Sequence, residues 1–120
     1  MSNLKAPTPV GPYSMFRYLS DNSDWVMAGS IPIDPISGQL NNETVQMEVI
    51  QVFDNIEAVL ADNGKTLADI KKFTVFLMDL TSTALVNAEI EKRIKGEYPA
   101  RSTIQVAGLP MGARVEIECL

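Results

Sequence analysis

The helical periodicity between Thr44 and Asn63 is the feature that most restricts how this chain can fold. Apolar side chains recur there at three- and four-residue spacing, namely Val45, Val49, Val52, Phe53, Ile56, Val59 and Leu60. This spacing predicts an amphipathic helix with one broad apolar stripe. Thr44 suits the N-cap, and Gly64 suits the left-handed position that follows a C-terminus. Such a helix must bury its stripe against a sheet or against another helix.

The remaining segments predict strands and one further helix. Strands are expected at residues 14–20, 25–31, 71–80, 103–107 and 113–119, and an irregular arm at 1–9. A polar turn is expected at 21–24. Ser82 or Thr83 caps a second predicted helix that runs to about Lys95 and ends at Gly96. Its apolar residues are expected to face inward (Leu85, Val86, Ile90, Ile94), and its Glu89–Arg93 and Glu91–Lys95 pairs outward.

The strand predicted at 71–80 is apolar on both faces, with Phe73, Val75 and Leu77 on one and Phe76 and Met78 on the other. A strand exposed to water on one side would alternate cleanly, so both faces are expected to be covered. Two helices cannot cover both faces of one sheet. The sequence therefore predicts a homo-oligomer in which another copy covers the second face.

Composition restricts the function. A chain of 120 residues is expected to form a single domain over residues 1–120. Its net charge of −5 argues against nucleic-acid binding. The absence of histidine excludes Ser-His-Asp and Cys-His hydrolysis and nearly all zinc sites. A lone cysteine, no secretory signal and no long apolar run predict a cytoplasmic protein that does not span a membrane.

Arg101 is the first candidate for a functional residue. Pro99 stiffens the chain that leads to it, and the strand predicted from Thr103 follows immediately. A guanidinium held at the mouth of a strand can bind a carboxylate through two parallel hydrogen bonds. A surface arginine without function is the simpler alternative.

Glu116 is the second candidate. It lies opposite Val115 and Ile117 in the last predicted strand, so it points away from the helix-packed core. If another subunit covers that face, desolvation raises the pKa of Glu116 and suits the carboxylate to handling a water molecule. A solvated strand carboxylate is the alternative.

Three further residues have both a functional and a structural interpretation. Tyr13 follows a Gly-Pro corner and Asn87 lies in the first turns of the second predicted helix. A structural phenol and a surface amide are the simpler explanations. Gly29 within a strand indicates either a close approach by another group or a bulge.

Several motifs together resemble the RidA/YjgF family of reactive-intermediate deaminases, whose members are also known as L-PSP endoribonucleases. The resemblance covers nearly the whole chain, and its main segments are Gly11-Pro12-Tyr13-Ser14, Thr74-Val75-Phe76-Leu77, Pro99-Ala100-Arg101-Ser102 and Val115-Glu116-Ile117-Glu118. The predicted segments already give a ββαβαββ order and an α+β sandwich with both helices on one face of a mixed sheet. The resemblance implies that this sandwich is chorismate-mutase-like. It also implies a homotrimer with sites between subunits.

The family hydrolyses imines and enamines such as 2-iminopropionate and 2-iminobutyrate to 2-keto acids and ammonia, without a cofactor or metal. By resemblance, Arg101 binds the substrate carboxylate and Glu116 orients the attacking water. The family's substrate-pocket positions correspond to Tyr13, Gly29 and Asn87. Thr103 stands where many members have cysteine, and is also assigned to substrate binding.

Two departures concern the pocket, because Ala28 and Ser30 replace the family's usual serine and glutamine. Two alternative functions therefore stay open. One is an endoribonuclease that acts on single-stranded RNA, which the acidic composition disfavours. The other is a non-catalytic trimer that binds small carboxylates or partner proteins.

Overall fold

The computed structural model describes residues 5–19 and 24–120. Its strands and α-helices follow in the order β1 (Phe16–Tyr18), β2 (Trp25–Met27), α1 (Val45–Asp62), β3 (Lys72–Leu77), α2 (Thr83–Arg93), β4 (Ala100–Gln105) and β5 (Val115–Cys119). Residues 5–9 have no regular structure, as the sequence predicts. The start of the predicted arm and most of the predicted turn at 21–24 lie outside the described residues.

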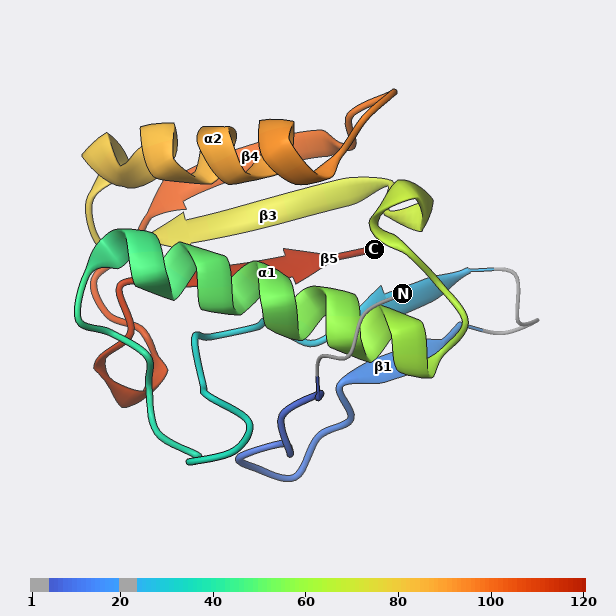
Figure 1. Ribbon diagram of the computed structural model, residues 1–120, viewed down its shortest axis with the longest axis horizontal. Coiled ribbons are helices and arrows are strands. Elements are labelled where there is room, and N and C mark those ends of the chain that lie inside the picture. Colours follow the sequence, from blue (N-terminus) through green and yellow to red (C-terminus); the bar gives the residue numbers. More distant parts are fainter. Residues whose placement is uncertain (1–4, 20–23) are drawn as a thin grey trace.

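The sheet is mixed, which confirms the prediction. β3 is its centre, because it pairs in parallel with β4 and antiparallel with β5. β1 and β2 form an antiparallel hairpin. An isolated bridge joins the segment after β2 to β5: the Ser30 amide donates to the Ile117 carbonyl at 2.8 Å, and the Ile117 amide donates back at 3.1 Å. The strands therefore lie side by side from β4 to the hairpin (Figure 1).

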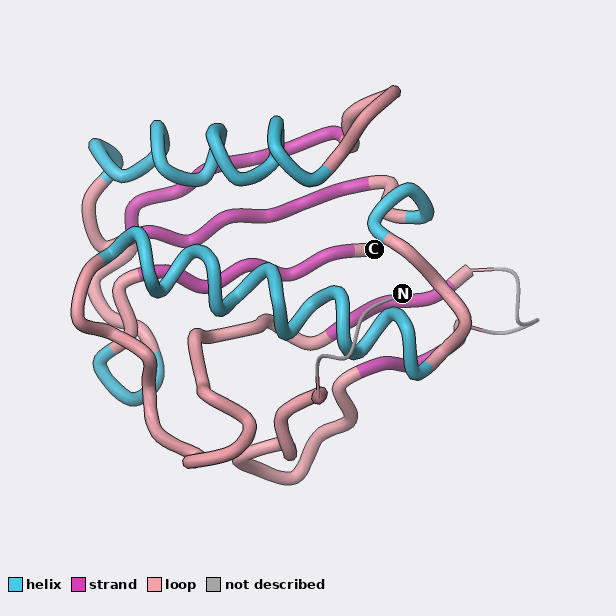
Figure 2. The backbone as a smooth tube through the Cα atoms, in the orientation of Figure 1, coloured by secondary structure: helices cyan, strands magenta, loops and turns pink. Residues whose placement is uncertain are grey.

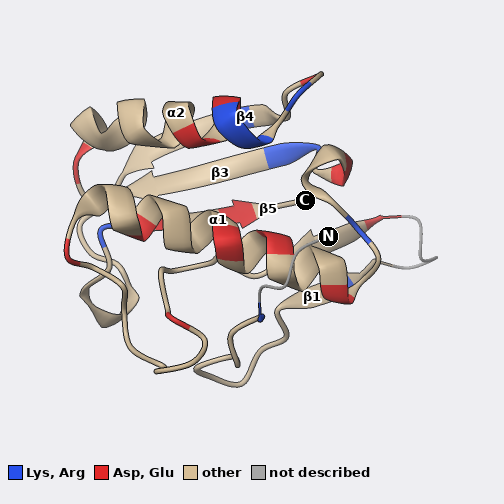
Figure 3. Cartoon of the chain, in the orientation of Figure 1, with Lys and Arg blue, Asp and Glu red and all other residues tan. Residues whose placement is uncertain are grey.

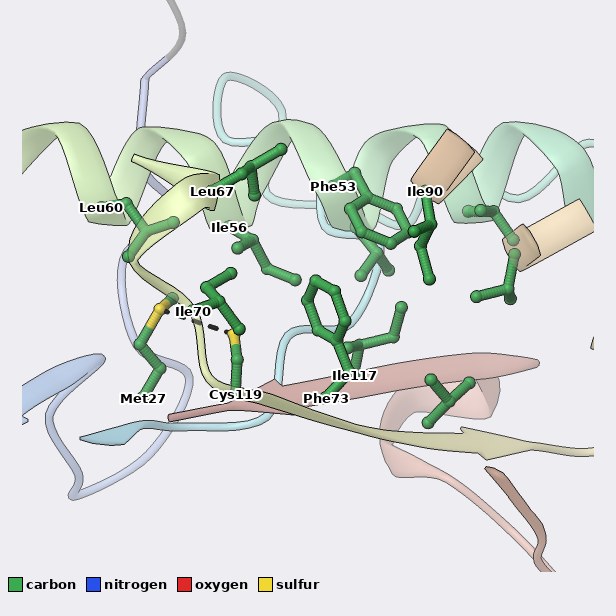
Figure 4. Close-up of a cluster of buried hydrophobic side chains, with 14 of the residues drawn as sticks. Met27, Phe53, Ile56, Leu60, Leu67, Ile70, Phe73, Ile90, Ile117 and Cys119 are labelled. Atoms are coloured by element: carbon green, nitrogen blue, oxygen red, sulfur yellow. Dashed lines mark hydrogen bonds between the residues drawn. The ribbon is translucent and has the colours of Figure 1, made fainter. Parts of the chain in front are cut away.

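Both helices cover the same face of the sheet (Figures 1 and 2). Phe73, Val75 and Leu77 of β3 point toward them and are buried, as predicted. Figure 4 shows side chains of α1, among them Phe53 and Ile56, meeting Phe73 and Ile117 in one continuous core. Burying each large apolar side chain contributes roughly 1.5–3 kcal/mol, so this layer supplies most of the stabilisation.

The ends of α1 follow the predicted capping pattern. The Thr44 side chain accepts a hydrogen bond from the Met47 amide at 3.0 Å. Asn63 is the C-cap, and Gly64 follows with a φ of 71°, a left-handed conformation that costs glycine little. No helix within residues 5–19 and 24–120 has both the length and the apolar composition needed to cross a bilayer.

Some predicted boundaries were wrong. The first two strands are shorter than expected, and α2 ends at Arg93. β4 begins at Ala100, three positions before Thr103, because parallel pairing with β3 already includes Ala100 opposite Lys72 and Arg101 opposite Phe73. Arg101 therefore lies inside the strand, where ladder hydrogen bonds fix its backbone, and not ahead of it.

The two ion pairs predicted on the outer side of α2 also need correction. Glu89 is buried, and Arg93 turns toward α1, where two further carboxylates bind it. Lys95 donates to the main-chain carbonyl of Glu91 at 3.1 Å, and not to its carboxylate. The i,i+4 spacing was right for Glu89 and Arg93, but the pair faces the neighbouring helix, because that helix supplies the charges.

Candidate active site

Arg101 lines a cavity of about 330 Å³ between α2 and β4. Its walls are formed by Phe73, Asn87, Ile90, Glu91, Tyr98, Pro99 and Arg101. Register explains the position: Arg101 is paired with Phe73, and partners in a ladder share a face, so its side chain lies on the helix side of the sheet. Because β4 is an edge strand of this sheet, the exposed guanidinium stays open to solvent.

Asn87 orients this guanidinium. The Arg101 Nη1 donates a short hydrogen bond to the Asn87 Oδ1. A guanidinium offers five N–H donors in a fixed plane, so one bond to α2 sets the plane and leaves donors for a ligand. The predicted pocket residues Arg101 and Asn87 are thus brought together. Such a fork suits two-point binding of a carboxylate.

Glu116 lines a different cavity, of about 380 Å³, on the opposite side of the sheet. Its walls are formed by Val10, Tyr13, Ala28, Gly29, Ile31, Pro110 and Glu116. Glu116 is paired with Phe76, which faces away from the helices, as predicted for the glutamate. The structure thus brings together three predicted site residues, Tyr13, Gly29 and Glu116.

Gly29 makes the position of this carboxylate possible. A Cβ built on Gly29 would lie far closer to the Glu116 carboxylate than real Cβ atoms ever approach, and 3.1 Å from its Cγ. The glutamate therefore lies directly over the glycine backbone. Of the two interpretations that the sequence left open, the close approach by another group is the one observed.

The environment of Glu116 changes its acidity. Burial raises the pKa of the Glu116 carboxyl, and the nearby negative charge of Glu118 raises it further. A half-buried carboxylate of increased basicity is suited to accept a proton from water. This agrees in direction with the expectation from sequence, and the single chain alone already produces it.

The two cavities do not meet within one chain. Arg101 and Glu116 lie on strands separated by β3, on opposite faces, and three residues apart along the register. Strand spacing and rise place their Cα atoms roughly 14 Å apart. One chain therefore presents Arg101 and Glu116 in two separate half-sites, each open to solvent on its own face.

Thr103, Ala28 and Ser30 differ in how close they lie to the two cavities. Thr103 is paired with Val75, so it shares the helix-side face with Arg101, but it lines neither cavity. Ala28 lies on the wall of the Glu116 cavity, and Ser30 does not. Ser30 is buried, and its hydroxyl has no hydrogen-bond partner among the described residues.

Two buried polar residues of α1 support the Glu116 half and were missed from sequence. Glu48 is fully buried, and its carboxylate accepts hydrogen bonds from the amide and the Nε of Arg114, just before β5. The Asn55 amide donates to the carbonyls of Ile33 at 2.8 Å and Ile31 at 3.3 Å. Both residues interrupt the apolar stripe of α1, which is the signal that could have revealed them.

Comparisons with known proteins match nearly the whole chain to one family. The family model described as endoribonuclease L-PSP matches residues 3–120. The human 2-iminobutanoate/2-iminopropanoate deaminase is 38% identical over 120 residues, covering 100% of this chain and 86% of the human protein. The crystal structure of RidA from an Antarctic Psychrobacter species superposes with a TM-score of 0.88 at 34% identity, covering 99% of this chain and 97% of the other.

A further structure, that of Escherichia coli TdcF with bound serine, superposes with a TM-score of 0.84 at 31% identity and covers 98% of this chain and 93% of the other. The matches extend over the whole sheet and both helices, and not over one motif alone. They confirm the resemblance seen in the sequence and the small α+β fold with its two helices and mixed sheet. The chain belongs to the RidA/YjgF family, whose family model is described as endoribonuclease L-PSP.

Proposed function

We propose that this protein hydrolyses 2-imino acids, such as 2-iminobutyrate and 2-iminopropionate, to 2-keto acids and ammonia. The observation that carries the proposal is that the chain presents two half-sites, an exposed guanidinium oriented by Asn87 at Arg101 and a half-buried carboxylate of raised pKa at Glu116. The name of the 38% identical human relative, an imine deaminase, supports the same chemistry.

In the proposed mechanism, Arg101 binds the substrate carboxylate and holds the imine carbon in place. The protonated imine carbon is electrophilic, so positioning a water molecule is the main requirement. Glu116 accepts a proton as the water oxygen attacks that carbon and forms a tetrahedral aminoalcohol. The proton then passes to the nitrogen. The carbon–nitrogen bond breaks with its electron pair on nitrogen, and the hydroxyl proton is lost as the keto group forms.

The proposed site is completed between copies of the chain. Because Arg101 and Glu116 occupy opposite faces, one chain cannot present both to one small substrate. The sheet face away from the helices carries Phe76 and the exposed Ile104 beside Glu116, which suits burial against a neighbour. We therefore propose a homotrimer in which Arg101 of one subunit faces Glu116 of the next, with Asn87, Tyr13, Gly29 and Thr103 forming the surrounding pocket.

A coupled assay tests the function. A pyridoxal-dependent threonine dehydratase generates 2-iminobutyrate, and the rate of 2-ketobutyrate formation is followed with and without this protein. The protein is expected to accelerate the hydrolysis, and Arg101→Ala is expected to abolish the acceleration. Near-normal turnover in Arg101→Ala would refute the assignment.

Ribonuclease activity is the second candidate, because the family description itself names it. The acidic composition, with a net charge of −5, disfavours a backbone-binding groove for RNA. Cleavage of single-stranded RNA that survives purification and disappears in Arg101→Ala would favour this candidate over the deaminase.

A further inference from the structure

Arg93, at the end of α2, is held by three carboxylates from two helices. Its Nε donates to the Glu89 carboxylate at 2.6 Å within α2. Its Nη1 reaches across to α1, where it donates to Glu57 at 2.7 Å and forms an ion pair with Asp54 at 2.9 Å. Only 15% of the Arg93 side chain is exposed. Figure 3 shows the basic residues at the end of α2 and the acidic residues along α1, which these ion pairs join.

The remaining contacts of Arg93 also involve α1. Its Nη2 approaches the Ile50 carbonyl at 3.4 Å, and its Cζ lies 5.7 Å from the centre of the Phe53 ring. Ile50 and Phe53, together with Asp54 and Glu57, follow the i, i+3, i+4, i+7 spacing of one helix face. The Arg93 guanidinium therefore lies along a single stripe of α1 and contacts it at four positions.

These contacts fix how α2 is rotated against α1. Val86 and Ile90 of α2 are buried in the core, and close packing there already limits large displacements of the helix. Hydrogen bonds from a planar guanidinium add a directional restraint on rotation and sliding that apolar contacts lack. A rotation of α2 by about 20° would move a side chain on its surface by roughly 2 Å, since the radius of a helix with side chains is about 5–6 Å.

Asn87 is the residue that such a rotation would displace. It lies between Val86 and Ile90 on α2, and its Oδ1 accepts the hydrogen bond from Arg101. Arg101 is exposed on an edge strand, and Asn87 provides the side-chain hydrogen bond observed for its guanidinium. A displacement of 2 Å exceeds what a hydrogen bond can absorb.

We propose that Arg93 is a positioning residue for the candidate site. By locking the rotation of α2, it holds Asn87 where that amide orients the guanidinium of Arg101 toward the substrate carboxylate. This inference rests on the proposed role of Arg101. It extends the site to a cluster of charges that joins α2 to α1 and lines neither cavity.

A double-mutant cycle separates positioning from simple destabilisation. Binding of 2-ketobutyrate is measured by titration calorimetry in the wild type, Arg93→Lys, Asn87→Ala and the double variant. Lysine keeps the charge but cannot bond three carboxylates in one plane. Each single variant is expected to weaken binding roughly tenfold, because small misplacements of a binding group are costly. The double variant is expected to bind no more weakly than Asn87→Ala.

Two additional variants keep the test decisive. Glu57→Gln removes the negative charge of one α1 partner of Arg93, and is expected to weaken binding in the wild type but not in the Asn87→Ala background. This variant replaces Arg93→Lys in the cycle if Arg93→Lys does not fold. Ile70→Val is the control for general loss of stability, because Ile70 lies at the Met27–Cys119 end of the core (Figure 4). It is expected to lower the melting temperature without changing the dissociation constant.

Two outcomes would overturn the role of Arg93 without affecting the proposed function. One is a double variant whose loss of affinity equals the product of the two single losses. The other is binding within twofold of wild type in folded Arg93→Lys and Glu57→Gln. The same titration with Arg101→Ala tests the proposed function itself. If Arg101→Ala binds 2-ketobutyrate as tightly as wild type does, the proposed function falls, and this inference falls with it.

Discussion

Gly29→Ala is the substitution whose outcome follows most directly from the geometry of the Glu116 half-site. The added methyl would overlap the Glu116 carboxylate, which has to move by about an ångström or more to reach ordinary contact. Overpacking of this kind costs roughly 1–3 kcal/mol. A carboxylate displaced by that distance is expected to lose about 10²-fold in kcat/KM.

The stability cost should depend on the glutamate. The backbone of Gly29 has no positive φ, so alanine fits its conformation and stiffens the unfolded chain. In a Glu116→Ala background the overlap disappears, and Gly29→Ala is expected to stabilise by about 0.4–1 kcal/mol. Urea unfolding of the wild type, the two single variants and the double variant at one protein concentration measures the change of sign. An equal cost in both backgrounds would refute the close packing of the glycine and the carboxylate.

Four further predictions concern charge, burial and buried hydrogen bonds. Burial, together with the charge of Glu118, raises the pKa of Glu116, so the acid limb of kcat/KM against pH is expected to move to lower pH in Glu118→Gln; an unmoved limb would contradict the role of Glu116. Because the folded state raises this pKa, Glu116 stabilises the fold below its unfolded pKa, and this contribution is lost as the pH rises through its folded pKa. Glu116→Gln is therefore expected to remove this decrease in the free energy of unfolding, measured by urea unfolding at a series of pH values. Asn55→Leu leaves the Ile33 carbonyl unpaired and removes one of the two hydrogen bonds to the Ile31 carbonyl, so it is expected to cost roughly 1–3 kcal/mol in urea unfolding; a cost well below about 1 kcal/mol would contradict its bonds. Burial raises the pKa of the Cys119 thiol to about 12, so an aromatic disulfide reagent at pH 8 should modify it only as the protein unfolds, and rapid modification of the folded protein would be inconsistent with burial.

Local patterns were sufficient to predict α1 and the faces of β3 and β5. The periodicity of α1 and its Thr44 cap depend only on neighbouring residues, and the alternation in β5 placed Glu116 on the outer face. The start of β4 could not be predicted in this way. Ala100 and Arg101 enter the strand because β3 pairs with them, and pairing with a distant segment leaves no local period.

Ion pairs that join different elements could not be predicted from the local sequence either. Arg93 follows Glu89 at helical spacing, which predicts a solvated pair on the outer face of one helix. The structure shows that the pair is completed by Asp54 and Glu57, and nothing local indicates that α1 would lie alongside. Glu48, in contrast, could have been singled out, because a carboxylate within an apolar stripe requires a buried partner.

The candidate site itself was only partly predictable. Motif resemblance named Arg101 and Glu116, and alternation gave the face of Glu116, but neither describes the space around the two residues. The separation into two cavities follows from strand order, since β3 lies between β4 and β5. That order also places Arg101 and Glu116 on opposite faces, which is why the proposed site requires a second copy of the chain.

Subunit complementation tests this central claim most directly. Arg101→Ala and Glu116→Gln are each expected to be inactive in the coupled 2-iminobutyrate assay, and the two proteins are then refolded together in equal amounts. If each site takes its arginine from one subunit and its glutamate from the next, about a quarter of the sites in random ring-shaped oligomers carry both intact residues. The account predicts recovery of about a quarter of wild-type activity. No recovery in mixed oligomers, whose formation is verified by native mass spectrometry, would contradict it.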